Sequence, residues 1–108
     1  MIKRTFNESP IVQGEDEIIS YTLTTTPWGS APTVVSVIVW DVTGANETAD
    51  WENVTATVMP TNTPSVVDDV ITLSPLKLLT DGNIYRLEIR FTCASNTFET
   101  YGLIIGGE

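Results

Sequence analysis

The sequence predicts an all-β fold, an antiparallel β-sandwich of about seven strands that forms a single domain over residues 1–108. Segments in which apolar and polar residues alternate recur roughly every 10 to 12 residues. Pro, Gly, Asn and Asp separate these segments, and no segment shows a helical period. A chain of 108 residues buries roughly 65% of its unfolded surface on folding, which is enough for one core without metals or disulfides.

Charge and composition exclude several classes of partner. The chain has 14 acidic and 5 basic residues and a net charge of −9, which repels nucleic acid phosphates and anionic lipids. No apolar run approaches the roughly 18 residues of a membrane-spanning helix, and the basic start is followed by polar residues instead of the apolar part of a secretion signal. Cys93 is the only cysteine, so the chain forms no internal disulfide. We therefore expect a protein that resides in a reducing cytosol.

The first predicted strands precede and follow a proline-rich bend. Residues 17–24 place Ile19, Tyr21 and Leu23 on one face and hydroxyl side chains on the other. The bend at 26–32 contains two prolines and a glycine, which the interior of a strand does not tolerate. The sheet resumes at 33–43.

The second half of the chain contains four more predicted strands. Two of them are 54–59, which alternates Val and Thr, and 66–73, which leads into Ser74-Pro75. After Asp81-Gly82, the segment 84–93 has the clearest alternation in the chain; its inward residues are Tyr85, Leu87, Ile89, Phe91 and Cys93. A turn at Ala94-Ser95-Asn96 leads into a closing strand at 97–105, with which an additional strand near residues 3–6 is expected to pair.

This strand count is typical of an immunoglobulin-like or fibronectin-III-like sandwich. Tyr85 follows Gly82 at the start of the penultimate strand, which is the position of a tyrosine corner, where the phenol bonds back to the backbone. Trp40 is expected to be the central core tryptophan. Leu23 and Leu87 would stand where antibody domains have their disulfide.

No set of residues in the sequence predicts catalysis, a metal or a cofactor. The chain has no histidine, which removes the usual triads and proton shuttles. Cys93 shares the inward parity of its strand and is expected to be a buried, inert thiol. The acidic clusters at 15–17, at 68–69 and across 41–52 lack the spacing of a calcium loop, so solvated charge is favoured over calcium. We expect a protein that is not an enzyme.

Two groups of residues are candidates for binding. Trp28 and Trp51 lie in bends, where an indole either stacks on a ligand such as a sugar ring or closes an open end of the sandwich. If Trp40 faces inward, Val35, Val37 and Val39 face outward. Three valines exposed on the outer side of a sheet are expected to be covered by other protein. That cover is either another subunit, which makes these valines an interface, or a terminus or loop of the same chain.

The chain resembles the small immunoglobulin-like structural proteins of tailed phages and prophages. The resemblance lies in the acidic "GEDEIISYTL" at 14–23, the all-valine strand after it, and "ITLSPLKLLTDGNIYRLEIRFTCASNTFETYGLIIGGE" at 71–108. It implies a virion component, such as an adaptor between tail and fibre, that binds other virion proteins or itself. It also implies a protein present in the bacterial cytoplasm during assembly and then in the virion. The alternative is a carbohydrate- or protein-binding immunoglobulin-like module of a bacterial surface protein, with Trp28 and Trp51 as its ligand-stacking residues.

Overall fold

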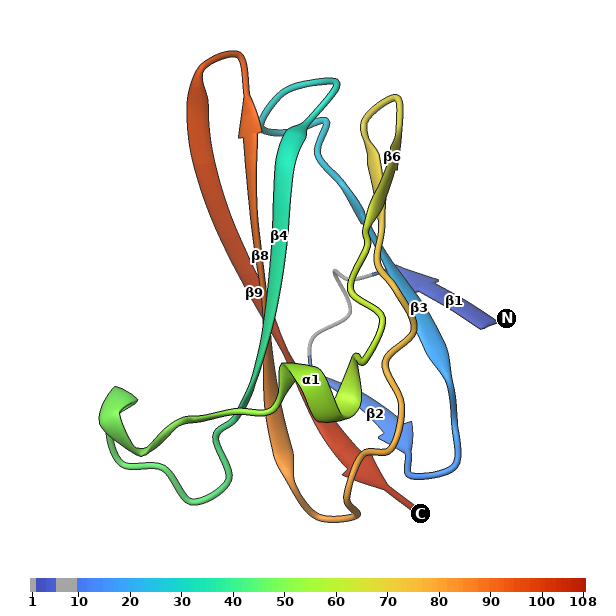
Figure 1. Ribbon diagram of the computed structural model, residues 1–108, viewed down its shortest axis with the longest axis vertical. Helices are drawn as coiled ribbons and strands as arrows, with labels where there is room; N and C mark the ends of the chain where they lie inside the picture. Colours follow the sequence, from blue (N-terminus) through green and yellow to red (C-terminus); the bar gives the residue numbers. More distant parts are fainter. Residues whose placement is uncertain (1, 6–9) are drawn as a thin grey trace.

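Two β-sheets form the two layers of the molecule (Figure 1) in the computed structural model, which describes residues 10–108 and the backbone of residues 2–5. The four-stranded sheet has the order β1 (Ile2–Thr5), β3 (Ile19–Thr24), β7 (Val70–Thr72) and β6 (Ser65–Val67). The five-stranded sheet has the order β2 (Ile11–Gly14), β9 (Asn96–Gly107), β8 (Ile84–Cys93), β4 (Thr33–Asp41) and β5 (Glu52–Asn53). A 3₁₀ turn, η1 (Thr48–Asp50), lies between β4 and β5 of the same sheet, and a short helix, α1 (Thr55–Val58), lies between β5 and β6 of the other sheet. The predicted all-β architecture of two layers is confirmed, with nine strands among the described residues instead of about seven.

The core lies between the two sheets and follows the alternation of β8. Tyr85, Leu87, Ile89, Phe91 and Cys93 are all buried, as their shared parity predicts. The residues between them face away from the core on the other side of the sheet. The buried thiol of Cys93 is also as predicted.

The β8–β9 hairpin sets the cross-strand register of the five-stranded sheet. Ala94 and Ser95 have φ angles of 49° and 71°, and positive φ at both central residues gives the tight turn whose twist matches the flanking strands. This turn pairs Cys93 with Asn96, and Arg90 with Glu99 further along. The closing strand therefore spans Asn96–Gly107 rather than 97–105.

The two N-terminal strands differ from the prediction. The strand expected near residues 3–6 is β1, but it runs parallel to β3 in the four-stranded sheet and does not pair with the closing strand. Instead β2 runs parallel to β9. A buried polar network holds β2 in place: Gln13 Nε2 donates to the carbonyl of Leu76 at 2.8 Å, and the hydroxyl of Tyr21 donates to Gln13 Oε1 at 2.8 Å. These bonds tie the edge of one sheet to β3 of the other.

The predicted strand at 54–59 is wrong, because part of this segment forms α1. The hydroxyl and backbone N–H of Thr55 both donate to Asn53 Oδ1, at 2.7 and 3.1 Å. The turn closes with the N–H of Met59 donating to the carbonyl of Thr55 at 2.8 Å. Because Val58 and Met59 are both buried, this segment packs on the core where the chain crosses from β5 to β6 (Figure 1).

The predicted strand at 66–73 is instead a hairpin. Its two arms, β6 and β7, pair antiparallel with Val67 opposite Val70. Asp68 has a φ of 55°, and Asp is among the residues that adopt this conformation readily. The acidic pair Asp68-Asp69 therefore makes the turn, which the sequence analysis placed inside a strand.

The prediction for the faces of β4 is wrong. Val37 is 4% exposed and Val39 is fully buried, so both face the core. Val35 is partly buried and also packs against the core. The side chains that alternate with these valines face the other way, and Trp40 is among them. The proposed interface of Val35, Val37 and Val39 is therefore part of the interior, and Trp40 is not a core tryptophan.

Tyr85 forms the contact predicted for a tyrosine corner. Its phenolic oxygen accepts a hydrogen bond of 2.9 Å from the backbone N–H of Thr80, while its ring is buried. Leu23 and Leu87 are both buried in the core, one from each sheet.

Candidate functional site

The side of the five-stranded sheet that faces away from the core carries the most distinctive group of side chains. We call it the β4–β8–β9 face. It consists of three cross-strand rows: Trp40–Arg86–Leu103, Ile38–Glu88–Tyr101 and Ser36–Arg90–Glu99. Since these residues occupy alternate positions of each strand, the same alternation that builds the core aligns them on this side.

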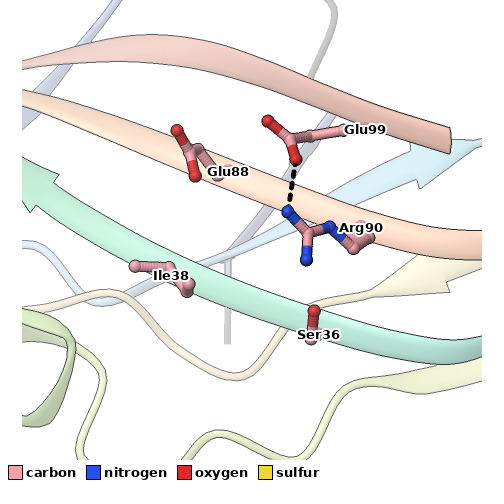
Figure 2. A pocket seen from close by; sticks show the side chains of 5 residues that line it. All are labelled: Ser36, Ile38, Glu88, Arg90 and Glu99. Atoms are coloured by element: carbon pink, nitrogen blue, oxygen red, sulfur yellow. Dashed lines mark hydrogen bonds and ion pairs between the residues drawn. The ribbon is translucent and has the colours of Figure 1, made fainter. Parts of the chain in front are cut away.

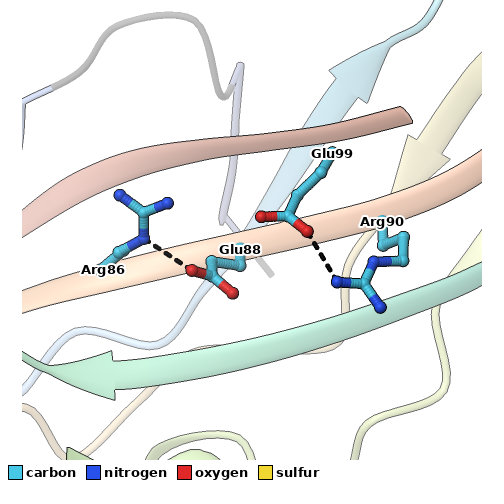
Figure 3. Close-up of polar contacts among 4 residues, drawn as sticks. All are labelled: Arg86, Glu88, Arg90 and Glu99. Carbon is cyan, nitrogen blue, oxygen red and sulfur yellow. Dashed lines mark hydrogen bonds and ion pairs between the residues drawn. The ribbon is translucent and has the colours of Figure 1, made fainter. Parts of the chain in front are cut away.

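Arg86 lies at the centre of an aromatic cluster on this face. Its guanidinium carbon is 3.5 Å from the ring centroid of Tyr101 and 4.9 Å from that of Trp51. Arg86 Nε also lies 2.7 Å from Glu88 Oε2 (Figure 3). The side chains of Arg86 and Glu88 are 18% and 16% exposed, so two rings and a carboxylate hold a largely covered cation.

Trp40 extends this cluster towards β5. Its ring centroid lies 6.1 Å from that of Trp51. Its Nε1 is buried and has no hydrogen-bond partner among the described residues. The cluster thus combines two indoles, one phenol and one arginine, the residue types that contribute most to protein–protein binding.

A shallow hollow lies beside this cluster. Ser36 and Ile38 line it from β4, Glu88 and Arg90 from β8, and Glu99 from β9 (Figure 2). Its enclosed volume is about 10 Å³, far below the roughly 300 Å³ at which small-molecule pockets begin. The small side chain of Ser36, between larger neighbours, leaves this space.

Arg90 and Glu99 form the exposed rim of the hollow. Arg90 Nη2 lies 2.7 Å from Glu99 Oε2. The hydrogen bond to Glu99, and then the charge of Glu99, raise the pKa of Arg90 above its ordinary value, so Arg90 stays charged. Because both side chains are well exposed, this pair contributes little to stability and remains available to a partner.

A second group of exposed residues lies at the end of the sandwich where the β3–β4, β6–β7 and β8–β9 connections meet (Figure 1). We call it the loop end. Trp28 packs edge-on against Phe91, with ring centroids 5.8 Å apart, and remains 41% exposed. Val34 is 80% exposed and has a φ of 51°. The backbone N–H of Thr25 donates to the carbonyl of Asp69 at 2.7 Å, which joins two of the three connections.

The structure does not bring Trp28 and Trp51 together. Trp28 packs on Phe91 near one end of β8, whereas Trp51 packs on Arg86 near the other. Trp28 partly closes an end of the sandwich, and Trp51 belongs to the β4–β8–β9 face. The two tryptophans therefore do not form one platform for a ligand.

Sequence reasoning did not identify Arg86, Tyr101 or the Arg90–Glu99 pair as site residues. One signal was present: a two-residue turn at Ala94 and Ser95 places Arg90 opposite Glu99 by simple counting. The position of Trp51 over Arg86 has no such signal, because it depends on how the segment after β4 folds back.

The side chains of the β4–β8–β9 face make aromatic, cation–π and ion-pair contacts. The sequence has no histidine. In the part of the chain that the structure describes, no three Cys, Asp or Glu side chains gather closely enough to hold a metal ion. None of the described helices has the length and apolar character needed to cross a bilayer.

Comparisons with protein-family models, with curated proteins and with solved structures gave no match to this chain.

Proposed function

We propose that this chain is a non-enzymatic structural or adaptor protein that acts through protein–protein contacts of a rigid β-sandwich. The observation that carries the proposal is the gathering of Trp40, Trp51, Arg86 and Tyr101 on one face of a sheet. Contacts among the four side chains hold them before any partner arrives, so a partner loses little side-chain entropy on binding. Burial of apolar area at about 25 cal/mol per Å² supplies the binding energy, less the cost of association.

The sandwich is proposed to be immunoglobulin-like. Two features support this assignment. The strand orders β1-β3-β7-β6 and β2-β9-β8-β4-β5 correspond to the A-B-E-D and G-F-C order of that fold, with β2 and β5 added at the edges. The hydrogen bond between Thr80 and Tyr85 is the contact of a tyrosine corner.

We further propose that the protein is a component of a phage or prophage particle. This part of the proposal depends on the resemblance of 14–23 and 71–108 to such proteins. It predicts a chain that assembles in the bacterial cytoplasm and ends in the virion. Binding of carbohydrate is the weaker alternative, because the guanidinium of Arg86 covers a face of Trp51 at 4.9 Å and the nearby hollow is small.

Site-specific photo-crosslinking tests the proposal. A photoreactive phenylalanine replaces Tyr101 in the chain produced in its native cells, and the control places it at Thr24, which is exposed on the opposite sheet. We expect discrete crosslinks to structural proteins from position 101 and none from position 24. Equal crosslinking from both positions, or none from position 101, would refute a contact role for this face.

A further inference from the structure

We infer that the β4–β8–β9 face binds the same face of a second copy of this chain, in a dimer with two-fold symmetry. This inference rests on the proposed function, because it names the partner of the same surface. Three observations support it: the distribution of charge, the opposite charges that face each other across β8 and β9, and the composition of the face.

The distribution of charge over the surface favours this face for self-association. Its charged residues are Arg86, Arg90, Glu88 and Glu99, whose charges cancel. The net charge of −9 therefore lies on the rest of the chain. Two copies that meet through other surfaces bring like charges together, which disfavours contact, whereas two copies that meet through this face do not.

The charges on β8 and β9 suit a two-fold contact. Arg90 on β8 lies directly opposite Glu99 on β9, and both side chains are on the outward side of the sheet. In a two-fold dimer the same patch serves both copies, so residue i of one meets residue j of the other, and the reverse. If the axis runs parallel to the strands between β8 and β9, Arg90 of each copy faces Glu99 of the other, and opposite charges meet twice.

The composition of the face also matches a dimer contact. Tyr101, Trp40 and Trp51 supply an aromatic centre, and Arg90 and Glu99 supply an exposed polar rim. An aromatic centre with a polar rim is the usual anatomy of an interface.

Light scattering of charge-reversal variants tests this inference. The samples are the wild-type chain, Arg90→Glu, Glu99→Arg, an equimolar mixture of these two variants, and Thr24→Glu as a control on the opposite sheet. The salt concentration is about 0.15 M, where the Debye length of about 8 Å screens the general repulsion between acidic chains. Since Arg90 and Glu99 are 61% and 44% exposed, both variants are expected to fold, and circular dichroism verifies this.

We expect a wild-type dimer at high protein concentration and a similar dimer for Thr24→Glu. Each single reversal makes like charges meet twice at the rim of the contact and weakens dimerisation at least about tenfold. In the mixture, one variant presents two glutamates to the two arginines of the other, so the dimer returns. A wild-type chain that remains monomeric, a dimer insensitive to both reversals, or a mixture that fails to associate would each overturn the inference.

The result is distinguishable from failure of the proposed function. A monomeric chain that still crosslinks through position 101 to a different protein would reject the second copy and retain the contact role of the face. A monomeric chain without crosslinks would reject both.

Discussion

The backbone N–H of Thr80 donates a hydrogen bond of 2.9 Å to the phenolic oxygen of Tyr85, five residues further along the chain. The same backbone segment packs over β9, because a Cβ placed on Gly106 would lie 2.9 Å from the carbonyl carbon of Thr80. The chain between Leu79 and Tyr85 is thus held from two sides. This corner sets where β8 begins, and therefore which of its residues face the core.

The substitution Tyr85→Phe removes the phenolic oxygen, so the backbone N–H of Thr80 loses its hydrogen-bond acceptor. We expect a loss of about 1 kcal/mol in the free energy of unfolding, measured by urea denaturation. Tyr101→Phe is the matched control, since the hydroxyl of Tyr101 lies on an exposed side chain, and its effect should stay within about 0.5 kcal/mol. Equal stability of Tyr85→Phe and the wild type would show that the corner contributes nothing.

Gly106 is required because the neighbouring backbone leaves no room for a side chain, whereas Gly44 is required because its backbone has a positive φ. Ala at 106 would press its Cβ against the backbone of Thr80, which cannot move aside, and we expect a loss of about 3 kcal/mol. Ala at 44 meets nothing within 4 Å but must adopt a φ of +66°, at a cost of about 1 kcal/mol. Thermal unfolding of the two variants measures the difference, and a reversed order would contradict the packing at the corner.

Val34 holds a left-handed backbone conformation that a β-branched residue adopts poorly. Its φ is 51° and its side chain is 80% exposed. Asn tolerates this conformation better, so Val34→Asn should raise the free energy of unfolding by about 1 kcal/mol. The neighbouring control Val35→Asn should lower it, because Val35 packs against the core. If Val34→Asn is no more stable than the wild type, the left-handed conformation at Val34 is not a source of strain.

Arg86 is held by the shape of its guanidinium as well as by its charge. Lysine keeps the charge but lacks the planar group that lies against Tyr101 and Trp51. We expect Arg86→Lys to lower stability by about 1 kcal/mol and to shift the tryptophan emission, since Trp51 loses its cover. Arg90→Lys, at an exposed ion pair, should change neither quantity. Identical emission spectra for the wild type and Arg86→Lys would argue against the stacked arrangement.

The sequence was most informative where a strand has one polar side. In β8 every second residue is polar, from Arg86 to Thr92, so a single parity buries the apolar side chains from Tyr85 to Cys93 and the inward face could be predicted. The tyrosine corner followed from the position of Tyr85 at the start of the same strand.

The faces of β4 could not be assigned from apolar periodicity alone. Valine or isoleucine occupies both parities between Val34 and Val39, and the register shift between Thr33 and Ser36 interrupts the alternation. The prediction placed Trp40 inward, as the central core tryptophan of an immunoglobulin-like sandwich, and was wrong. The informative residue is Ser36, the only polar side chain between Val34 and Val39; placing it outward turns Val35, Val37 and Val39 inward, as observed.

The other wrong predictions of secondary structure and strand pairing concern short segments. The stretch 54–59 alternates like a strand, yet one helical turn follows because Asn53 accepts hydrogen bonds from Thr55. The strands β1 and β2 pair parallel with β3 and β9, and parallel pairs are not joined by a hairpin turn that could be recognised in the sequence. The cluster around Arg86 depends on both the faces of β4 and the position of Trp51, so it became visible only in three dimensions.

Hydroxyl-radical footprinting of Tyr101 and Trp28 distinguishes the two exposed surfaces most directly. These side chains are 53% and 41% exposed in the single chain, one on the β4–β8–β9 face and one at the loop end. The measurement compares the dilute chain with the assembled chain, either as the dimer or in a complex of the unmodified chain with the partner that crosslinking identifies. We expect Tyr101 to lose reactivity on assembly while Trp28 keeps it. Protection of Trp28 with unchanged reactivity of Tyr101 would place the contact at the loop end and contradict a binding role for the β4–β8–β9 face.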